Sequence, residues 1–370
     1  MIRILNIIGS VNYGGAETLL MNIYRNIDLQ SFQFDFLIYE LPEEKSYFEE
    51  IKRMGGQIYV VPHKKDGILK SLTDIYRIVR KNRYTIVWRH TESMFKAIDL
   101  IPARIAGAKF TILHSHNTCP DDKKEAALGK MLSPILNLFV TDRYACGREA
   151  GEYMFGNRVF KIIHNGILTE KFFYNSIVRE TYRKQWEVHD YAVFGHVGRF
   201  EIAKNQQFLI DVFAEILKIN PQSLLLLIGE GSLKTEIEKK VCNLGIDKNV
   251  FFLGARDDVA NLLSTMDVLI FPSKYEGLPV TLIEAQAADL PCLVSNNVSE
   301  ECKVTENVRF EKLEAGEKYW ARTALRMIKK ERSNREKDIK DAGYDIKEIA
   351  HDLMLLWSES QDKNMKRIEK

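Results

Sequence analysis

Two carboxylates, Glu276 and Glu284, lie on either side of an expected strand-to-helix connection in the stretch FPSKYEGLPVTLIEA. The apolar run 267–271 is typical of a buried parallel strand, and residues 280–288 have the composition of a helix. The GLP sequence therefore lies where a helix begins, and a helix start offers free backbone N–H groups to an anion. One carboxylate lies just outside that helix and the other about two turns inside it. The two could contact opposite ends of one ligand that carries an anion, or they could be solvated glutamates of an ordinary surface connection.

Two cations follow another predicted strand, residues 192–197. Arg199 and Lys204 belong to the sequence GRFEIAKN, directly before a helix expected at 205–219. Cations at the carboxyl end of a parallel strand suit a diphosphate, because Arg can bind two oxygens and Lys supplies a point charge. Cleavage of a sugar–phosphate bond leaves negative charge on the departing phosphate, and preorganised cations would stabilise it. Exposed charges on a surface loop are the alternative.

Glycines end several of the predicted strands. Gly14 and Gly15 lie between the first strand and the first helix, where a missing side chain lets the backbone approach a ligand closely. The pattern is not GxGxxG, so a dinucleotide cofactor is disfavoured. Simple turns that bind no ligand are the alternative at each position. In the second half, the residues at strand ends are Gly198, Gly229, Glu230, Gly231 and Gly254.

Two histidines, His114 and His116, lie at the end of the fifth predicted strand and share one face as alternate residues. A metal pair is conceivable, but the sequence offers no evident third ligand, and a buried structural histidine is the alternative. The chain also lacks Asp-x-Asp, which would hold a divalent metal on a diphosphate. We therefore expect no metal and no cofactor, with Arg199 and Lys204 neutralising the phosphates.

The surrounding elements alternate between strand and helix. Apolar runs of strand length are followed by amphipathic helical segments through most of the first half, and the alternation restarts after a stretch without clean periodicity that opens with HNGI. Such alternation predicts an α/β protein with a doubly wound parallel sheet in each half. The expected parts are an N-terminal Rossmann-like domain at 1–166, a linker at 167–189, a C-terminal Rossmann-like domain at 190–345 and a final helix near 346–370.

Composition is that of an ordinary two-domain protein. The chain has 370 residues, of which 45% are hydrophobic and 28% charged, and its net charge of +2 does not suggest nucleic-acid binding. Five cysteines without CxxC spacing are typical of free thiols in a reducing cytoplasm. The apolar start MIRILNIIGS is short and ends in turn chemistry, so we interpret it as a strand and not as a signal peptide. No apolar run approaches the roughly 20 residues of a membrane span.

Together, the GGAE sequence at residues 14–17, the GR…K segment and the EGLP motif with its second glutamate resemble the retaining, nucleotide-sugar-dependent glycosyltransferases of the GT-B fold, family 4. The form with Lys-Asn at 204–205 is common among the capsule and exopolysaccharide enzymes of that family. The resemblance implies two Rossmann-like domains that face an interdomain cleft, with the final helix crossing back to the first domain.

The resemblance also implies roles for single residues. Glu276 would face the donor sugar, Glu284 would hold the ribose, and a histidine would hydrogen-bond the sugar. His116 is our first choice for that histidine and His114 the second, with His90 a weaker candidate. Arg199, Lys204, Glu276 and His116 form the expected catalytic set. The expected donor-binding residues are Gly14, Gly15, Gly198, Gly229, Glu230, Gly231, Arg256, Tyr275, Gly277, Leu278, Pro279 and Glu284, with Asn165 as an additional candidate.

The activity that the resemblance implies is transfer of a sugar, with retention, from a nucleoside diphosphate sugar to an acceptor. Uridine diphosphate is the expected carrier, and the acceptor would be a saccharide or a lipid-linked saccharide of a surface polysaccharide. The family's usual proposal is same-face substitution, in which the leaving phosphate accepts the acceptor's proton. The expected location is the cytoplasm, including the inner face of the membrane through peripheral contact.

Two other functions stay open on the sequence alone. One is a different reaction on the same fold, as in a nucleotide-sugar epimerase or a phosphorylase. The former would need acid–base carboxylates in the first domain and the latter a cofactor lysine, and the sequence marks neither. The other is a binder of nucleotide sugars without catalysis, which the intact set of two cations and two carboxylates argues against.

Overall fold

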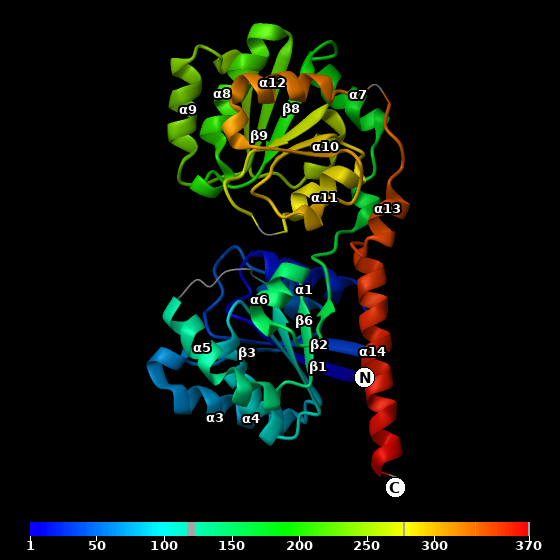
Figure 1. Ribbon diagram of the computed structural model, residues 1–370. Coiled ribbons are helices and arrows are strands. Elements are labelled where there is room, and N and C mark those ends of the chain that lie inside the picture. Colours follow the sequence, from blue (N-terminus) through cyan, green and yellow to red (C-terminus); the bar gives the residue numbers. More distant parts are fainter. Residues whose placement is uncertain (117–122, 277, 330, 369–370) are drawn as a thin grey trace. The chain divides into compact units, whose positions relative to one another are not determined.

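The computed structural model describes residues 1–116, 123–276, 278–329 and 331–368 (Figure 1). The chain divides into two compact units. Unit 1 consists of Met1–Gly166 and Ile346–Lys370, and unit 2 consists of Ile167–Asp345. Within the described residues, no helix is long and apolar enough to cross a membrane.

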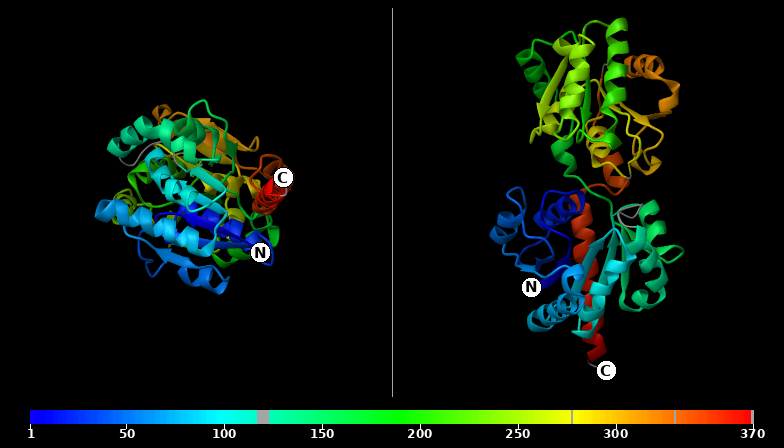
Figure 2. Two further views of the ribbon diagram at one scale, coloured as in Figure 1. Left: turned by 90° about the horizontal axis from the view of Figure 1, so that it is seen from below. Right: turned by 90° about the vertical axis from the view of Figure 1, so that its left-hand side faces the viewer.

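Unit 1 is built on a seven-stranded parallel sheet of order β3-β2-β1-β4-β5-β6-β7. Helices lie on both faces of the sheet, as the views in Figure 2 show. The strands are β1 (Ile2–Ile7), β2 (Phe32–Ile38), β3 (Ile58–Val60), β4 (Ile86–Thr91), β5 (Phe110–Ser115), β6 (Asp142–Ala145) and β7 (Lys161–Ile162). The helices are α1 (Gly15–Asn26), α2 (Phe48–Arg53), α3 (Lys64–Asn82), η1 (Met94–Asp99), α4 (Leu100–Ile105), α5 (Lys123–Leu136), η2 (Asn137–Phe139), α6 (Arg148–Phe155) and α14 (Ile346–Ile368).

The last helix of the chain, α14, packs on unit 1. Trp357 is 2% exposed, and its ring centre lies 5.7 Å from those of Phe32 and Phe34 on β2. The red helix runs beside β1 and β2 in Figure 1. Aromatic burial of this kind is worth a few kcal/mol per side chain, so it fixes the position of α14 on the sheet of unit 1.

Unit 2 repeats the architecture with a six-stranded parallel sheet of order β10-β9-β8-β11-β12-β13. The predicted α/β fold with two doubly wound parallel sheets is therefore confirmed. The strands are β8 (Ala192–Val197), β9 (Ser223–Ile228), β10 (Val250–Gly254), β11 (Val268–Phe271), β12 (Cys292–Ser295) and β13 (Val308–Glu311). The helices are η3 (Thr169–Phe172), α7 (Ser176–Gln185), η4 (Ile202–Lys204), α8 (Gln206–Ile219), α9 (Lys234–Asn243), η5 (Asp247–Asn249), α10 (Val259–Thr265), α11 (Val280–Ala287), η6 (Glu300–Cys302), η7 (Leu313–Ala315), α12 (Glu317–Arg326) and α13 (Glu336–Asp341).

The stretch 167–189, expected to be a linker, folds as part of unit 2. Its helix α7 packs against α10 because Arg183 and Arg179 both form ion pairs with Asp267, the first at 2.6 Å. Asp267 Oδ2 also accepts from Val193 N at 2.8 Å. A buried carboxylate needs such partners, and no short-range pattern in the sequence reveals a pairing between residues so far apart in the chain.

In each unit the strand order reverses between two neighbouring strands. This point lies between β1 and β4 in unit 1 and between β8 and β11 in unit 2. Helices leave the sheet toward opposite faces on the two sides of such a point, so a crevice forms at the carboxyl ends of the strands, where open α/β sheets bind ligands. The loops that follow these four strands are therefore the places to look for a site.

Candidate functional site

An ion pair between Lys204 and Glu276 joins the loops that follow β8 and β11. Lys204 Nζ lies 2.6 Å from Glu276 Oε2, and the two side chains are 18% and 22% exposed. The ammonium also lies 5.1 Å from the centre of the Phe271 ring, within range of a cation–π contact. The pair thus occupies the point where the strand order of unit 2 reverses.

Backbone contacts hold these two loops in place. Lys274 N donates to Ala203 O at 2.8 Å, and Asn205 Nδ2 donates to Pro272 O at 3.1 Å. Asn205 adopts a left-handed backbone with a φ of 56°, which Asn tolerates better than most residues. The loops therefore keep the Lys204 ammonium opposite its carboxylate through contacts other than the ion pair itself.

The other predicted cation, Arg199, extends into solvent. Its side chain is 74% exposed, and Nη1 lies 3.3 Å from Glu201 Oε1. Its backbone is better fixed, because Gln206 Nε2 donates to Arg199 O at 2.7 Å and lies 3.3 Å from His196 Nε2. The structure thus brings Lys204 and Glu276 together and leaves the guanidinium of Arg199 outside that pair.

The glycines at these strand ends let the loops approach each other closely. A Cβ on Gly229, whose φ is +135°, would lie 2.2 Å from Gly198 O. A Cβ on Gly231, whose φ is +159°, would lie 2.5 Å from Phe200 O. Both positions demand glycine, because a side chain would overlap backbone. The loops after β8 and β9 therefore pack directly on each other beside the Lys204 chain.

Three further predicted donor residues lie at the surface of unit 2. Glu230 pairs with Lys234 at 3.1 Å. Arg256 donates to both carboxylate oxygens of Asp258 at 2.7 and 2.6 Å, and this contact lowers the pKa of Asp258 to about 2. Tyr275 is 64% exposed. Arg256 is therefore engaged by an acid of its own loop.

The helix start after Glu276 differs slightly from the expectation. Pro279 precedes α11 as its N-cap, whereas the composition suggested that it lies within the first turn. Leu278 packs against the core, and Gly277 lies outside the described residues. Glu284 lies inside α11, and burial raises its pKa to about 7, against the opposing influence of Lys171. This carboxyl group therefore changes its charge close to pH 7.

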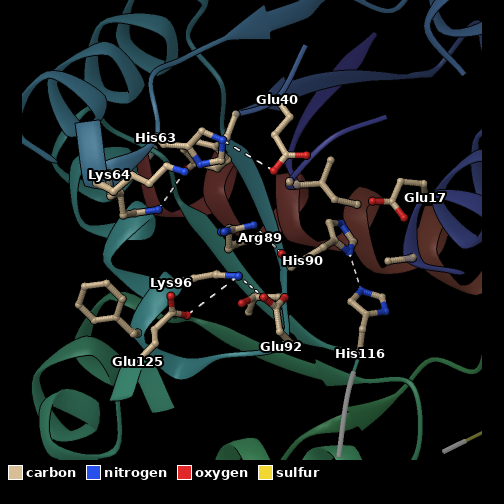
Figure 3. Close-up of a pocket in the computed structure, with 17 residues that line it drawn as sticks. Glu17, Glu40, His63, Lys64, Arg89, His90, Glu92, Lys96, His116 and Glu125 are labelled. Carbon is tan, nitrogen blue, oxygen red and sulfur yellow. Dashed lines mark hydrogen bonds and ion pairs between the residues drawn. The ribbon is translucent and has the colours of Figure 1, made fainter. Parts of the chain in front are cut away.

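Unit 1 has a cavity of about 540 Å³ where its own strand order reverses (Figure 3). His90 and His116 line it from the ends of β4 and β5, and Glu17, Glu92 and Lys96 add charge. Glu92 and Lys96 form an ion pair with each other. The cavity is therefore polar, but much of its charge is already paired.

A buried carboxylate behind this cavity holds two of its cations. Asp99 is fully buried, and its oxygens lie 2.8 Å from both Lys64 Nζ and Arg89 Nε. Tyr39 Oη donates to the same carboxylate at 2.7 Å. Burial lowers the pKa of Lys64 in spite of its acidic partner. None of these four residues was predicted, because they come from four separate segments and carry no local motif.

The predicted histidines lie side by side, with ring centres 4.1 Å apart, but only one of them lines the cavity. His116 lines the cavity, whereas His114 lies behind it, fully buried, with its ring stacked on Trp88 at 5.6 Å. Of the two, His116 is the one that a ligand in the cavity could reach. Asn165 has a buried Oδ1 atom without a hydrogen-bond partner among the described residues.

The GGAE sequence lies at the start of α1. Gly14 is the N-cap and Gly15 the first helical residue. Its acidic residue, Glu17, lines the cavity, and burial raises the pKa of that carboxyl group. Gly14 and Gly15 do not line the cavity, so Glu17 is the residue of the GGAE sequence that a ligand in the cavity could contact.

Comparison with known proteins decides the family. The family model described as "Glycosyl transferases group 1" matches residues 178–342. The "Putative glycosyltransferase EpsF" of Bacillus subtilis (strain 168) is 32% identical, over 99% of this chain and 98% of that protein. The chain belongs to the group 1 glycosyltransferases. The predicted resemblance is thereby confirmed.

Two further similarities concern this glycosyltransferase. An Escherichia coli protein named "UDP-Gal:alpha-D-GlcNAc-diphosphoundecaprenol alpha-1,3-galactosyltransferase" is 28% identical over 64% of each chain. The crystal structure of Anabaena Alr3699/HepE in complex with UDP has a TM-score of 0.77 at 18% identity, covering 97% of this chain and 100% of that one. Together with the two parallel sheets, this likeness shows the GT-B fold.

The raised pKa of Glu284 predicts a pH-dependent stability. Between its ordinary value of 4.5 and about 7, the folded chain keeps a proton that the unfolded chain has released. This group's contribution to stability therefore falls as pH rises through that window. Glu284→Gln has no group to ionise at this position, so its free energy of unfolding should not show this fall. When pH is raised from about 5 to about 8, the difference in free energy of unfolding between variant and wild type should shift in favour of the variant by at least about 1 kcal/mol, as measured by urea unfolding.

Glu180→Gln, on the exposed face of α7, is the control for that measurement. It should track the wild type at both pH values. If Glu284→Gln also tracks the wild type, the raised pKa is contradicted.

Proposed function

We propose that this glycosyltransferase moves a sugar from a UDP-sugar to a lipid-linked saccharide, with retention of anomeric configuration, in the synthesis of a surface polysaccharide. The observation that carries the proposal is the Lys204–Glu276 pair at the carboxyl ends of β8 and β11. It combines a cation for a phosphate with an acceptor of hydroxyl hydrogen bonds for a sugar.

A bound donor would replace the ion pair: its diphosphate would bind Lys204 and its sugar would bind Glu276. A diphosphate carries more negative charge than one carboxylate, so it attracts the Lys204 ammonium more strongly. Glu276 is then released to accept hydrogen bonds from sugar hydroxyl groups. Arg199, exposed on the same loop as Lys204, can turn to bind two phosphate oxygens. Glu284, which lies on α11 about two turns beyond Glu276, would accept hydrogen bonds from the ribose hydroxyl groups.

The chemistry would be substitution on one face of the sugar. The bond from the anomeric carbon to the phosphate oxygen breaks, and the bond to the acceptor oxygen forms on the same face. The acceptor's proton passes to the leaving phosphate, so no side-chain nucleophile is required. Lys204 and Arg199 stabilise the negative charge that develops on that phosphate.

The support for UDP and for a lipid-linked acceptor comes from similar proteins. The Escherichia coli relative is named for UDP-Gal as donor and for an acceptor on diphosphoundecaprenol, and HepE was crystallised with UDP. The cavity of unit 1 suits a saccharide, since its lining combines carboxylates, cations and a neutral histidine. We assign the acceptor to that cavity, with His116 as a hydrogen-bonding group.

A lipid-linked acceptor would bring the protein to a membrane, and one surface of unit 1 fits an anionic lipid surface. A stripe at helical spacing along α5 and η2 exposes large apolar side chains, with Met131 at 68% and Leu138 at 78% exposure. Exposed Lys130 lies on the same helix. Apolar and cationic side chains together are typical of a peripheral membrane contact. The stripe consists of Leu128, Met131, Ile135 and Leu138.

Met131→Asp is expected to weaken binding to vesicles that contain anionic lipid, because a charge would have to enter the lipid interface. Co-sedimentation with such vesicles measures it. Leu355→Asp, at another exposed leucine on α14, should bind like the wild type. Wild-type protein that stays in the supernatant, or two variants that bind alike, would contradict this surface.

Lys204→Ala is expected to lower kcat by about 100-fold or more, since one preorganised group at a developing charge is typically worth that much. Nucleotide release from a panel of nucleotide sugars with candidate acceptors measures it. Lys274→Ala, an exposed lysine on the facing loop, is the control and should remain near wild type.

Added Mg²⁺ should not raise turnover, because lysine and arginine already neutralise the diphosphate.

The possible outcomes of this experiment separate the claims. Wild-type protein that releases no nucleotide with any donor and acceptor contradicts the proposed function, and epimerised donor without transfer indicates the epimerase alternative. Transfer with near-normal kinetics in Lys204→Ala leaves the function standing but contradicts the phosphate assignment.

A further inference from the structure

Three histidines come together at the base of the unit 1 cavity. His90 on β4 and His114 on β5 are register partners in the parallel sheet, and His116 follows two residues later on the same face. His90 Nδ1 lies 3.0 Å from His116 Nε2 (Figure 3). One ring nitrogen from each of the three lies within 4.8 Å of the others.

Several of these ring nitrogens lack a partner among the described residues. Both nitrogens of His114 are buried without a hydrogen bond, and so is Nδ1 of His116. His90 and His114 are 2% and 0% exposed. A buried polar group left unpaired costs about 1–3 kcal/mol, and nearly all such groups in folded proteins find a partner. His90 Nδ1 and His116 Nε2 face each other, and each neutral imidazole carries one N–H and one lone pair. A cation in place of the proton between these two atoms would take a lone pair from each and a third from His114.

We propose that His90, His114 and His116 bind one divalent transition-metal ion, zinc in the first instance, with its remaining coordination position open to the cavity. Three imidazole nitrogens and an open position are a known zinc arrangement. Imidazole ligands also select zinc, cobalt or nickel over Mg²⁺, which prefers oxygen. This inference does not rest on the assignment of the diphosphate to Lys204 and Arg199 of unit 2. It does share His116 with the proposed acceptor site, where a bound ion would take the place of that imidazole as the group that contacts the acceptor.

The geometry needs little adjustment to hold an ion. Zinc–nitrogen bonds of about 2.0–2.1 Å in a tetrahedron place ligand nitrogens about 3.4 Å apart. His90 Nδ1 and His116 Nε2, 3.0 Å apart, are already close to that separation, and a nitrogen of His114 lies within 4.8 Å of the nitrogens of the other two rings. Asn6 Oδ1 lies 3.4 Å from His90 Nε2, so Asn6 can accept that proton and leave Nδ1 free to coordinate.

The test uses the full, untagged chain, stripped with a chelator and then titrated with Zn²⁺ and with Co²⁺. We expect one ion per chain by elemental analysis, a visible absorption band typical of tetrahedral Co²⁺, and a higher Tm with Zn²⁺. His116→Gln, at the rim of the cluster, should weaken Zn²⁺ affinity by at least about 10-fold. It should also abolish the Tm shift.

His63→Gln is the matched control, because His63 lines the same cavity but lies outside the cluster. It should bind Zn²⁺ and Co²⁺ as the wild type does. Wild-type protein that binds no ion contradicts the site without reference to any variant. Zn²⁺ affinity that is unchanged in His116→Gln, or that falls to the same extent in His63→Gln, also contradicts it.

Discussion

The ion pair between Lys204 and Glu276 depends on one feature of the fold, the parallel pairing of β8 with β11. The two residues are 72 positions apart in the chain, and adjacent strands of the sheet bring their loops together. Backbone hydrogen bonds between the loops position the two side chains, so the attraction between the charges need not hold the loops. The two side chains are only 18% and 22% exposed, so neither charge can be left without a partner at small cost. A ligand that displaces the pair would have to supply a new partner to each of them.

The two units use the same crevice of an open sheet for different charge patterns. In unit 2 the cations at the crevice are one exposed arginine and one lysine with a replaceable partner, which suits an anionic ligand. In unit 1 three of the cations that line the cavity are committed to acids, Lys64 and Arg89 to Asp99 and Lys96 to Glu92. The ring nitrogens of His114 and Nδ1 of His116 are buried without a hydrogen-bond partner among the described residues. A neutral, hydroxyl-rich acceptor or a metal ion fits that cavity better than a second phosphate group.

The sequence was informative where a local pattern reports on the backbone. The strand expected at 192–197 is β8, an apolar run that ends before a glycine. The helix expected at 280–288 is α11 to within one residue, and it begins directly after a proline. That Lys204 and the EGLP motif lie on neighbouring loops depends on the strand order, which places β11 beside β8 and which no local pattern reveals. Residues 167–189, where the sequence predicts a linker, belong to unit 2 in the structure. The partner that orders α7, Asp267, lies far along the chain, so no local pattern indicates it. Likewise α5, α6 and β13 were not predicted, as their patterns are short or interrupted.

Long-range pairing also explains why part of the site in unit 1 cannot be predicted from the sequence. His90 was the third histidine of a cluster for which the sequence offered only two members, and only the register of β4 against β5 reveals it. Asp99 has no motif, yet it holds two cations of the cavity.

The anomeric configuration of the product is the most direct test of the central claim that the acceptor replaces the departing phosphate with retention of configuration. The measurement is proton NMR of the glycoside formed from an α-linked UDP-sugar. The account predicts an α-linked product, and a β-linked product would contradict it.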